Sequence, residues 1–373
     1  MLFNKKSGKK ISREQVLAAL SHVDDPDLKK DLVTLKMIED LVIDGNNVSF
    51  KVVLTTPACP MKDAIQNACI NAIKLMVSQD AEVEAIMTSR VLADQNNQVL
   101  PNVKNIIAIS SGKGGVGKST VAANLAVSLS KSGAKVGLID ADIYGPSMPI
   151  MFGFEGERPM LEKVGEKDLL VPYERHGVKL MSIGVLVRTD QAIVWRGPMA
   201  SKALRQLIFD TNWGEIDYLL VDLPPGTGDL HLTLVQALPV TGAVVITTPQ
   251  KVAVADARKG AEMFKLPQIQ VPILGVIENM SFFIPDDAPE KRYKLFGEGG
   301  GQLLAEGLET QLLGQIPMRE GIRANGDDGH PVAAGDDPVL SEAFLQLSQT
   351  VAQQLAIRHS MAPPTTKVNM SMP

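Results

Sequence analysis

The residues best suited to chemistry lie in one glycine-rich stretch that ends in lysine, serine and threonine. It fits the pattern G-x-x-x-x-G-K-[ST] and reads Gly112, Lys113, Gly114, Gly115, Val116, Gly117, Lys118 and Ser119, with Thr120 next. Glycines let successive backbone N–H groups turn inward around phosphate oxygens, and a helix that begins here adds its positive N-terminal end. We expect this stretch to bind a nucleotide, with Lys118 at the β- and γ-phosphates and the Ser119 hydroxyl on Mg²⁺.

Lys113 has no role in an ordinary phosphate-binding loop of this kind. A cation directly after the first glycine could meet the charge that develops during phosphoryl transfer, as an arginine finger does when a partner supplies it. The alternative is a solvated surface lysine. We therefore expect Lys113 and Lys118 to be candidate catalytic residues.

Two acidic segments follow strand-like apolar runs. Residues 218–221 form an apolar run that ends in Asp222, an arrangement typical of an acid that holds Mg²⁺ directly or through water. Residues 136–139 run into Asp140 and Asp142, at the sheet edge where α/β proteins bind their ligands. We expect Asp222 to bind Mg²⁺ and Asp142 to orient the attacking water. For Asp142 the alternative is a helix or loop cap.

These residues need a sheet to bring them together, and the pattern after the first part of the chain predicts one. Short, almost wholly apolar runs recur, most of them separated by helical segments, which indicates a mostly parallel sheet covered on both faces. The runs lie at residues 106–109, 136–139, 218–221, 243–247 and 273–277. We predict an α/β P-loop NTPase domain over residues 104–360. Asp337 is expected to cap a last long helix at about residues 339–358, before a disordered tail at residues 361–373.

The chain before this domain has a different pattern. It predicts helices at residues 12–23 and 61–77, a hairpin at residues 37–55 and a strand at residues 82–92. These elements make a small α+β domain over residues 10–93. The polar, aperiodic residues 94–103 are predicted to be a linker.

Composition narrows the class of protein. The chain has 373 residues, a formal net charge of −5 and 45% hydrophobic residues, which is ordinary for a soluble protein of two or three domains. The net acidity argues against a dominant electrostatic grip on nucleic acid or on an anionic membrane. The sequence shows neither a secretory signal nor an apolar run of about 20 residues. We expect a cytoplasmic protein that binds neither nucleic acid nor membrane.

The two cysteines are too few for a disulfide framework, which fits a reducing compartment. Cys59 lies in a proline-rich turn just before a predicted helix, where a thiol can have a lowered pKa and serve as a metal ligand. The alternative is a small structural residue of that turn. Cys69 lies within the helical pattern, and we expect it to be a buried core thiol.

Four segments resemble one family. The family is the Mrp/ApbC iron–sulfur cluster carrier ATPases, and the segments are GKGGVGKST, DADIYGPSMP, DYLLVDLPPGTGD and GVIENMS. It belongs to the deviant Walker-A group, with MinD, ParA-type proteins and the nitrogenase iron protein. The N-terminal LTTPACPMKDAI also resembles the small domain of iron–sulfur assembly factors, which is commonly fused to Mrp proteins. The resemblance covers nearly the whole chain except the first ten residues and the tail.

The resemblance implies an ATP-hydrolysing homodimer that is gated by nucleotide and that exchanges iron–sulfur clusters with scaffold proteins and recipient apoproteins. Lys113 would cross the dimer interface toward the partner's nucleotide. Asp142 would be the switch I acid and residues 222–229 the switch II segment. Asn279 would contact adenine, the alternative being a capping or turn amide.

One departure from the family concerns the cluster itself. Many members carry a C-x-x-C pair after the Asn-Met-Ser segment, and two such chains are thought to hold a bridging [4Fe–4S] cluster. Residues 282–290 contain no cysteine here, although a cluster needs about four thiolates. A dimer that pairs two Cys59 thiols with outside ligands could still hold a [2Fe–2S] or transient cluster. The alternative function is an ATP-gated scaffold or chaperone that holds no cluster. A positioning ATPase like MinD or ParA is disfavoured, because neither a basic amphipathic C-terminal helix nor a basic surface is evident.

Overall fold

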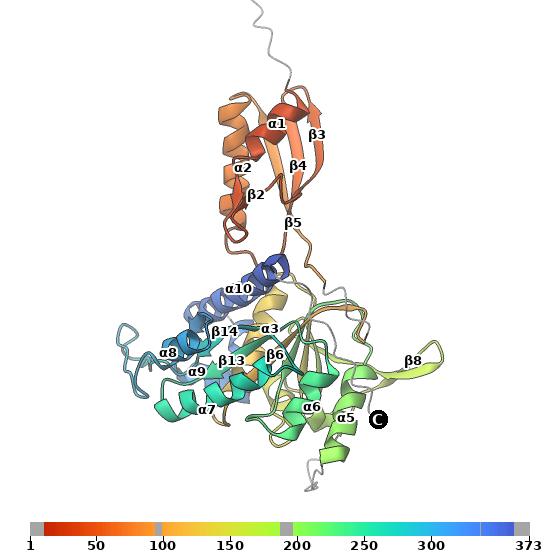
Figure 1. The fold of residues 1–373 in the computed structure, drawn as a ribbon, viewed down its shortest axis with the longest axis vertical. Coiled ribbons are helices and arrows are strands. Elements are labelled where there is room, and N and C mark those ends of the chain that lie inside the picture. The colour runs from red at the N-terminus through yellow and green to blue at the C-terminus, as the bar shows by residue number, and fades with distance from the viewer. Residues whose placement is uncertain (1–10, 94–98, 187–196, 336, 362–373) are drawn as a thin grey trace, which may run out of the picture. The chain divides into compact units, whose positions relative to one another are not determined.

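The computed structural model of the chain describes residues 11–93, 99–186, 197–335 and 337–361. The chain divides into two compact units, Met1–Leu92 and Ala93–Pro373, and each is described by itself (Figure 1). The predicted tail lies outside the described residues except for Met361, which ends the last helix.

The small unit is a three-stranded sheet with two helices packed on it. Its elements are α1 (Arg13–Leu20), β1 (Asp24–Asp25), β2 (Lys30–Asp31), β3 (Ile38–Asp44), β4 (Asn47–Leu54), α2 (Lys62–Met76) and β5 (Glu82–Ser89). The predicted hairpin is confirmed: β3 and β4 are antiparallel, and Gly45 in the turn between them has a φ of 61°. β5 returns parallel to β4. Phe50, Ile65 and Ile73 lie in the core between sheet and helices, so the predicted α+β unit is present.

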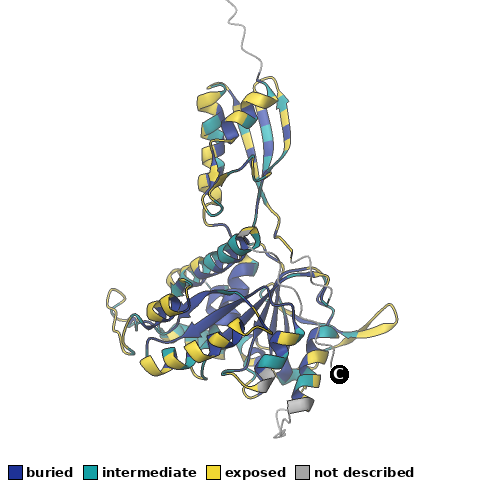
Figure 2. Ribbon diagram, viewed as in Figure 1, coloured by how far each residue is buried: buried dark blue, intermediate teal, exposed yellow. Residues whose placement is uncertain are grey.

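The large unit contains an eight-stranded sheet, and only its edge strand β10 runs antiparallel to its neighbour. In spatial order the strands are β10 (Tyr173–Arg175), β11 (Val178–Ser182), β7 (Val136–Asp140), β12 (Ile216–Asp222), β6 (Val103–Ser111), β13 (Gly242–Thr247), β14 (Ile273–Glu278) and β15 (Leu312–Gln315). The central strands are buried on both faces, as Figure 2 shows. The predicted mostly parallel α/β sheet is therefore confirmed.

Helices cover both faces of this sheet. They are α3 (Lys118–Lys131), α4 (Met148–Met151), η1 (Ile183–Leu186), α5 (Gly197–Phe209), α6 (Asp229–Ala237), α7 (Lys251–Glu262), η2 (Met263–Lys265), α8 (Gly300–Gly307), α9 (Glu320–Asp327), η3 (Val332–Ala334) and α10 (Pro338–Met361). The connection through α3 runs from β6 toward β7, whereas those through α6, α7 and α8 step the other way along the sheet. Because parallel crossovers are right-handed, α3 lies on the face opposite these three helices. α10 packs beside α3.

Two further features complete the fold. An exposed hairpin is formed by β8 (Leu161–Val164) and β9 (Lys167–Leu170). Asp337 caps α10 as predicted, since its Oδ1 accepts the backbone N–H groups of Val339 at 2.9 Å and Leu340 at 3.1 Å.

The strand order explains how the candidate residues come together. β12 lies between β7 and β6, and all three run parallel. Their carboxyl ends therefore meet at one edge of the sheet, where Asp222 pairs in register with Asp140 and the glycine-rich stretch leaves β6. This is the edge at which open parallel sheets bind ligands.

Candidate functional site

The glycine-rich stretch connects the end of β6 to the first residue of α3, Lys118. Gly117 caps the helix with a φ of 79°, in the left-handed region that favours glycine, and a Cβ there would lie 2.2 Å from Asn279 Nδ2. At Gly112 a Cβ would lie 2.0 Å from the backbone carbon of Asp256 in α7. The fold thus requires glycine at the first and last glycine positions of the motif. This holds whether or not a bound phosphate also needs the space.

A buried lysine and a buried carboxylate form the centre of the site. Lys118 is 6% exposed, and its Nζ lies 2.6 Å from Oδ1 of the fully buried Asp222. The Ser119 hydroxyl donates to the other oxygen of Asp222 at 2.5 Å. Asp142 Oδ2 lies 3.8 Å from the same ammonium. The residues that the motif and the strand ends single out therefore lie within one cluster of contacts.

The acidic side of this cluster carries more negative charge than its one lysine balances. Burial, and then the neighbouring Asp222 carboxylate, raise the pKa of Asp140 to about 7. Burial also raises the pKa of Asp222, against the opposing effect of Lys118. Asp140 accepts hydrogen bonds from the Met148 N–H at 3.1 Å and the Ser182 hydroxyl at 2.9 Å, so it fixes the chain after β7. A cation bound here would relieve the crowding of carboxylates.

The donor set fits Mg²⁺. Asp222 and the Ser119 hydroxyl offer hard oxygen atoms, which Mg²⁺ prefers. Within the described ranges, no group of three or more His, Cys, Asp or Glu side chains could hold a metal ion by itself. Mg²⁺ typically takes one or two protein oxygens and completes its shell with water and substrate phosphates. The cluster matches that pattern.

Asp142 and Lys113 flank the cluster. Asp142 is almost fully buried, and its Oδ1 accepts the Tyr144 N–H at 3.2 Å, so it caps the loop while its other oxygen faces Lys118. Lys113 is half-buried, and its carbonyl accepts the Ser111 hydroxyl at 3.0 Å. In the part of the chain that the structure describes, no ion pair involves the Lys113 ammonium. Its side chain is thus available to a group from outside.

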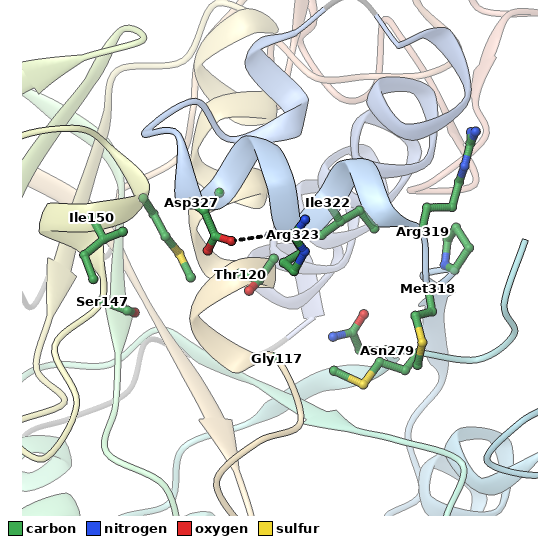
Figure 3. A pocket seen from close by; sticks show the side chains of 14 residues that line it. Gly117, Thr120, Ser147, Ile150, Asn279, Met318, Arg319, Ile322, Arg323 and Asp327 are labelled. Atoms are coloured by element: carbon green, nitrogen blue, oxygen red, sulfur yellow. Dashed lines mark hydrogen bonds and ion pairs between the residues drawn. The ribbon is translucent and has the colours of Figure 1, made fainter. Parts of the chain in front are cut away.

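A cavity of about 360 Å³ opens beside the glycine-rich stretch, between the N-terminus of α3 and α9 (Figure 3). Its lining is mainly apolar and consists of Gly117, Thr120, Ser147, Ile150, Met151, Asn279, Met280, Pro317, Met318, Arg319, Ile322, Arg323, Gly326 and Asp327. Asn279 donates through Nδ2 to the Val116 carbonyl at 2.9 Å, which ties the cavity wall to the phosphate-binding loop. A flat apolar group attached to phosphates bound at Lys118 could therefore enter this cavity.

The far wall of the cavity was not predicted. Arg323 and Asp327 pair across one turn of α9 at 2.7 Å (Figure 3). Arg319 lies 3.0 Å from Asp286 and 3.5 Å from Asp337, so it joins the cavity wall to the stretch at residues 282–290 and to the start of α10. No motif marks these residues, and α9 contains no buried residue whose spacing could have indicated it.

For Cys59 the structure does not provide the lowered pKa that a thiol near a helix N-terminus can have. The residue is 9% exposed, and burial raises the pKa of its thiol to about 11, with a smaller contribution from the carboxylates of Asp27 and Asp25. A backbone hydrogen bond at Met61 opposes this only in part. Cys69 is fully buried in the core of the small unit, as predicted, and burial raises its pKa to about 12. Neither thiol is poised as a thiolate.

The sheet topology, the loop between β6 and α3 and the Lys118–Asp222–Ser119 cluster define a P-loop nucleoside-triphosphatase fold. Residues 102–353 match the family described as NUBPL iron-transfer P-loop NTPase, and residues 13–85 match the family described as iron-sulfur cluster assembly protein. The chain belongs to the iron-transfer P-loop NTPase family, which confirms the resemblance read from its motifs. Among the described residues, no helix has both the length and the apolar character needed to cross a membrane.

Individual relatives agree with this assignment. The chain is 46% identical to the iron-sulfur cluster carrier protein of Synechocystis sp., over 94% of this chain and 99% of the relative. It is 44% identical to the protein of the same name from Deinococcus radiodurans, over 92% and 96%. Among solved structures, a nucleotide-binding protein of Archaeoglobus fulgidus in complex with ADP has a TM-score of 0.55 and 37% identity, covering 66% of this chain and 95% of that one.

Proposed function

We propose that this protein is a cytoplasmic, ATP-hydrolysing homodimer that carries or assembles iron–sulfur clusters under the control of its nucleotide. The observation that carries the proposal is the buried contact of Lys118 and Ser119 with Asp222, beside a cavity of suitable size for a base. Family membership supplies the iron–sulfur context, since the relatives of similar length are named cluster carriers.

The chemistry follows from the positions of the side chains. ATP phosphates would lie along the glycine-rich stretch, with adenine in the cavity against Asn279. Bound Mg²⁺, held by Ser119 and Asp222, would neutralise charge on the β- and γ-phosphates. Lys118 would exchange its contact with Asp222 for phosphate oxygens, and Asp142 would accept a proton of the attacking water. Lys113 has no ion-pair partner in the described part of its own chain, and it would reach the nucleotide of the second copy.

Phosphate release tests the catalytic part of this proposal. We expect Lys118→Ala and Lys113→Ala to lower turnover by at least about 100-fold, because each removes a charge that stabilises the transition state. Lys131→Ala, at the exposed end of α3, is a matched control that should retain wild-type turnover. Thermal unfolding of each variant checks that it is folded. Undiminished turnover in both site variants would contradict the mechanism.

Sedimentation tests the nucleotide gate. With Mg²⁺ and a non-hydrolysable ATP analogue, we expect a species of twice the 40.1 kDa chain mass. ADP should return the monomer or a weaker dimer. A mass that is the same with ADP, with the analogue and without nucleotide would exclude gating by dimerisation.

A second candidate function is an ATP-gated scaffold or chaperone that holds no cluster. The observation that favours it is the pair of buried thiols with raised pKa values, together with the absence of cysteine from residues 282–290. Anaerobic reconstitution distinguishes the two, with iron and sulfide measured on wild type, Cys59→Ala and the matched control Cys69→Ala. Loss of iron in Cys59→Ala alone supports the carrier. Equal iron in all three excludes cluster binding by Cys59.

A further inference from the structure

His231 lies in the first turns of α6, directly after the loop at residues 223–228 that follows Asp222. The side chain is 1% exposed. Among the described residues, neither ring nitrogen of His231 has a hydrogen-bond partner. The buried hydroxyls of Ser110 and Ser147 near the candidate site also lack a partner among the described residues, but His231 is the titratable side chain of this group, and nothing in the mechanism above uses it.

An aromatic ring, a nearby cation and two backbone carbonyls surround the imidazole of His231. Its plane meets that of Phe264 edge to face, with the ring centroids 6.0 Å apart. Burial lowers the pKa of His231 to about 4, and the positive charge of Lys118 lowers it further. The carbonyls of Gly226 and Pro224 face the ring and oppose this shift, but they fall short of hydrogen-bonding geometry. At neutral pH the imidazole therefore keeps one N–H donor and one acceptor nitrogen.

Such a residue is costly if packing is its only role. A buried donor without a partner loses its hydration and gains no hydrogen bond, and an aliphatic side chain of similar size would avoid that cost. Unpartnered buried groups are rare in folded proteins and often mark functional strain. A partner that arrives in another arrangement of the neighbouring loop would account for His231.

The loop at residues 223–228 is able to supply that partner. Gly226 has a φ of 91°, and its N–H donates to the carbonyl of Ser111 at 2.9 Å, which fastens the loop to the base of the phosphate-binding stretch. Gly226 is partly exposed, and Thr227 and Gly228 are exposed. Glycine tolerates reorientation of its peptide groups better than any other residue. The Gly226 carbonyl, which faces the ring, is therefore the acceptor that a reoriented loop could offer to the imidazole N–H.

We propose that His231 is a positioning residue for this loop: when ATP is bound, its imidazole N–H donates to the Gly226 carbonyl and holds the loop in the arrangement required for hydrolysis. His231 acts through the backbone and touches no reacting atom. The inference rests on the proposed ATP hydrolysis, and it identifies the residue that fixes the loop.

Two substitutions test the role. His231→Leu removes both ring nitrogens and keeps an apolar volume, whereas His231→Gln retains an N–H donor. We expect His231→Leu to lower kcat about tenfold, the effect of one hydrogen bond in the transition state, with KM for ATP within about twofold and no loss of thermal stability. His231→Gln should recover most of kcat. Phe264→Leu is the packing control and should lower thermal stability more than kcat.

The outcomes separate the hypotheses. If His231 only fills space, His231→Leu will match wild type in kcat, or the Leu and Gln variants will lose activity equally, and either result overturns the inference. If wild type shows no more ATP turnover than Lys118→Ala, the proposed ATPase function itself is contradicted. That result is distinguishable from a failure of the role inferred for His231. A second measurement uses wild type alone, with ¹⁵N-labelled histidine observed by NMR. The His231 N–H should show a hydrogen-bonded shift with Mg²⁺ and a non-hydrolysable ATP analogue; unchanged ring nitrogens would overturn the inference even if His231→Leu failed to fold.

Discussion

Lys118 in the large unit and Cys59 in the small unit are both reactive groups near the first turn of a helix, and they are almost equally buried. Lys118 has Asp222 at 2.6 Å and Asp142 at 3.8 Å. Cys59 has no compensating cation among the groups that shift its pKa; its charged neighbours there are the carboxylates of Asp27 and Asp25. At a similar degree of burial, Lys118 thus has oppositely charged neighbours and Cys59 has none among these groups.

The difference shows what a helix N-terminus can and cannot do. Its partial positive charge is weak compared with the desolvation of a fully buried ion. Lys118 carries a buried charge because carboxylates from two neighbouring strands compensate it. The thiol of Cys59 lacks an equivalent partner, so its neutral form is favoured. Four predictions test this contrast.

The largest effect is expected from Asp222→Asn. The substitution removes the negative charge and one of the two oxygens that accept from Lys118 and Ser119, and with them the carboxylate proposed to hold Mg²⁺, so turnover should fall by about 100-fold or more. Asp217→Asn is the matched control, because Asp217 is a buried carboxylate on the same strand that binds Lys104 at the opposite end. It should alter stability and leave turnover near wild type. Equal losses in the two variants would show that any buried charge on β12 supports the fold and none is specific to the reaction.

The next largest effect concerns the stability of the glycine-rich stretch that leads to Lys118. Gly112→Ala places a Cβ against the backbone of Asp256, so α7 must shift, and we expect the free energy of unfolding to fall by about 2 kcal/mol. At Gly114 no heavy atom lies within 4 Å of an added Cβ, and Gly114→Ala should change stability by less than about 0.5 kcal/mol. Denaturant titrations of the two variants measure the difference. Similar stabilities would mean that the loop and α7 are not in close contact.

A smaller effect concerns pH. The pKa of Asp140 is about 7 in the folded chain, above its unfolded value near 4. Between about pH 4 and pH 7 this carboxyl is therefore protonated in the folded state and ionised in the unfolded state. Asp140 thus favours folding fully below about pH 4, and this contribution is lost as the pH rises to about 7. Both proteins are measured without Mg²⁺ or nucleotide. As the pH rises from 5 to 8, wild type loses this contribution and Asp140→Asn does not, so the Tm of the variant minus that of wild type should increase by on the order of a few degrees. A Tm difference that stays constant over this range would exclude a raised pKa for Asp140.

The sequence predicted the parts of this site that are local or strongly periodic. The glycine-rich stretch carries its own geometry, and the five apolar runs correspond to β6, β7, β12, β13 and β14. Short elements escaped prediction: β15 has four residues and β10 three, too few for a pattern. α9 contains no buried residue, so the cavity wall at Arg319 and Arg323 depends on tertiary packing. The raised pKa of Cys59 likewise depends on burial by tertiary packing and, to a smaller degree, on Asp27 and Asp25, which are distant in the sequence.

The smallest effect on activity is expected from Cys59→Ala, which should change ATP turnover by less than about twofold. The decisive measurement is instead the reactivity of the thiol in wild type. With a pKa of about 11, only about one thousandth of Cys59 is thiolate at pH 8, so alkylation by iodoacetamide should be about 100-fold slower than for a free cysteine. The experiment uses the Cys69→Ala background, so that all alkylation measured is that of Cys59.

Rapid alkylation would mean that this turn opens in solution, which would remove the contrast with Lys118 and make Cys59 accessible as a cluster ligand. Slow alkylation, together with iron binding that is lost in Cys59→Ala, would require a cluster donor to open the turn.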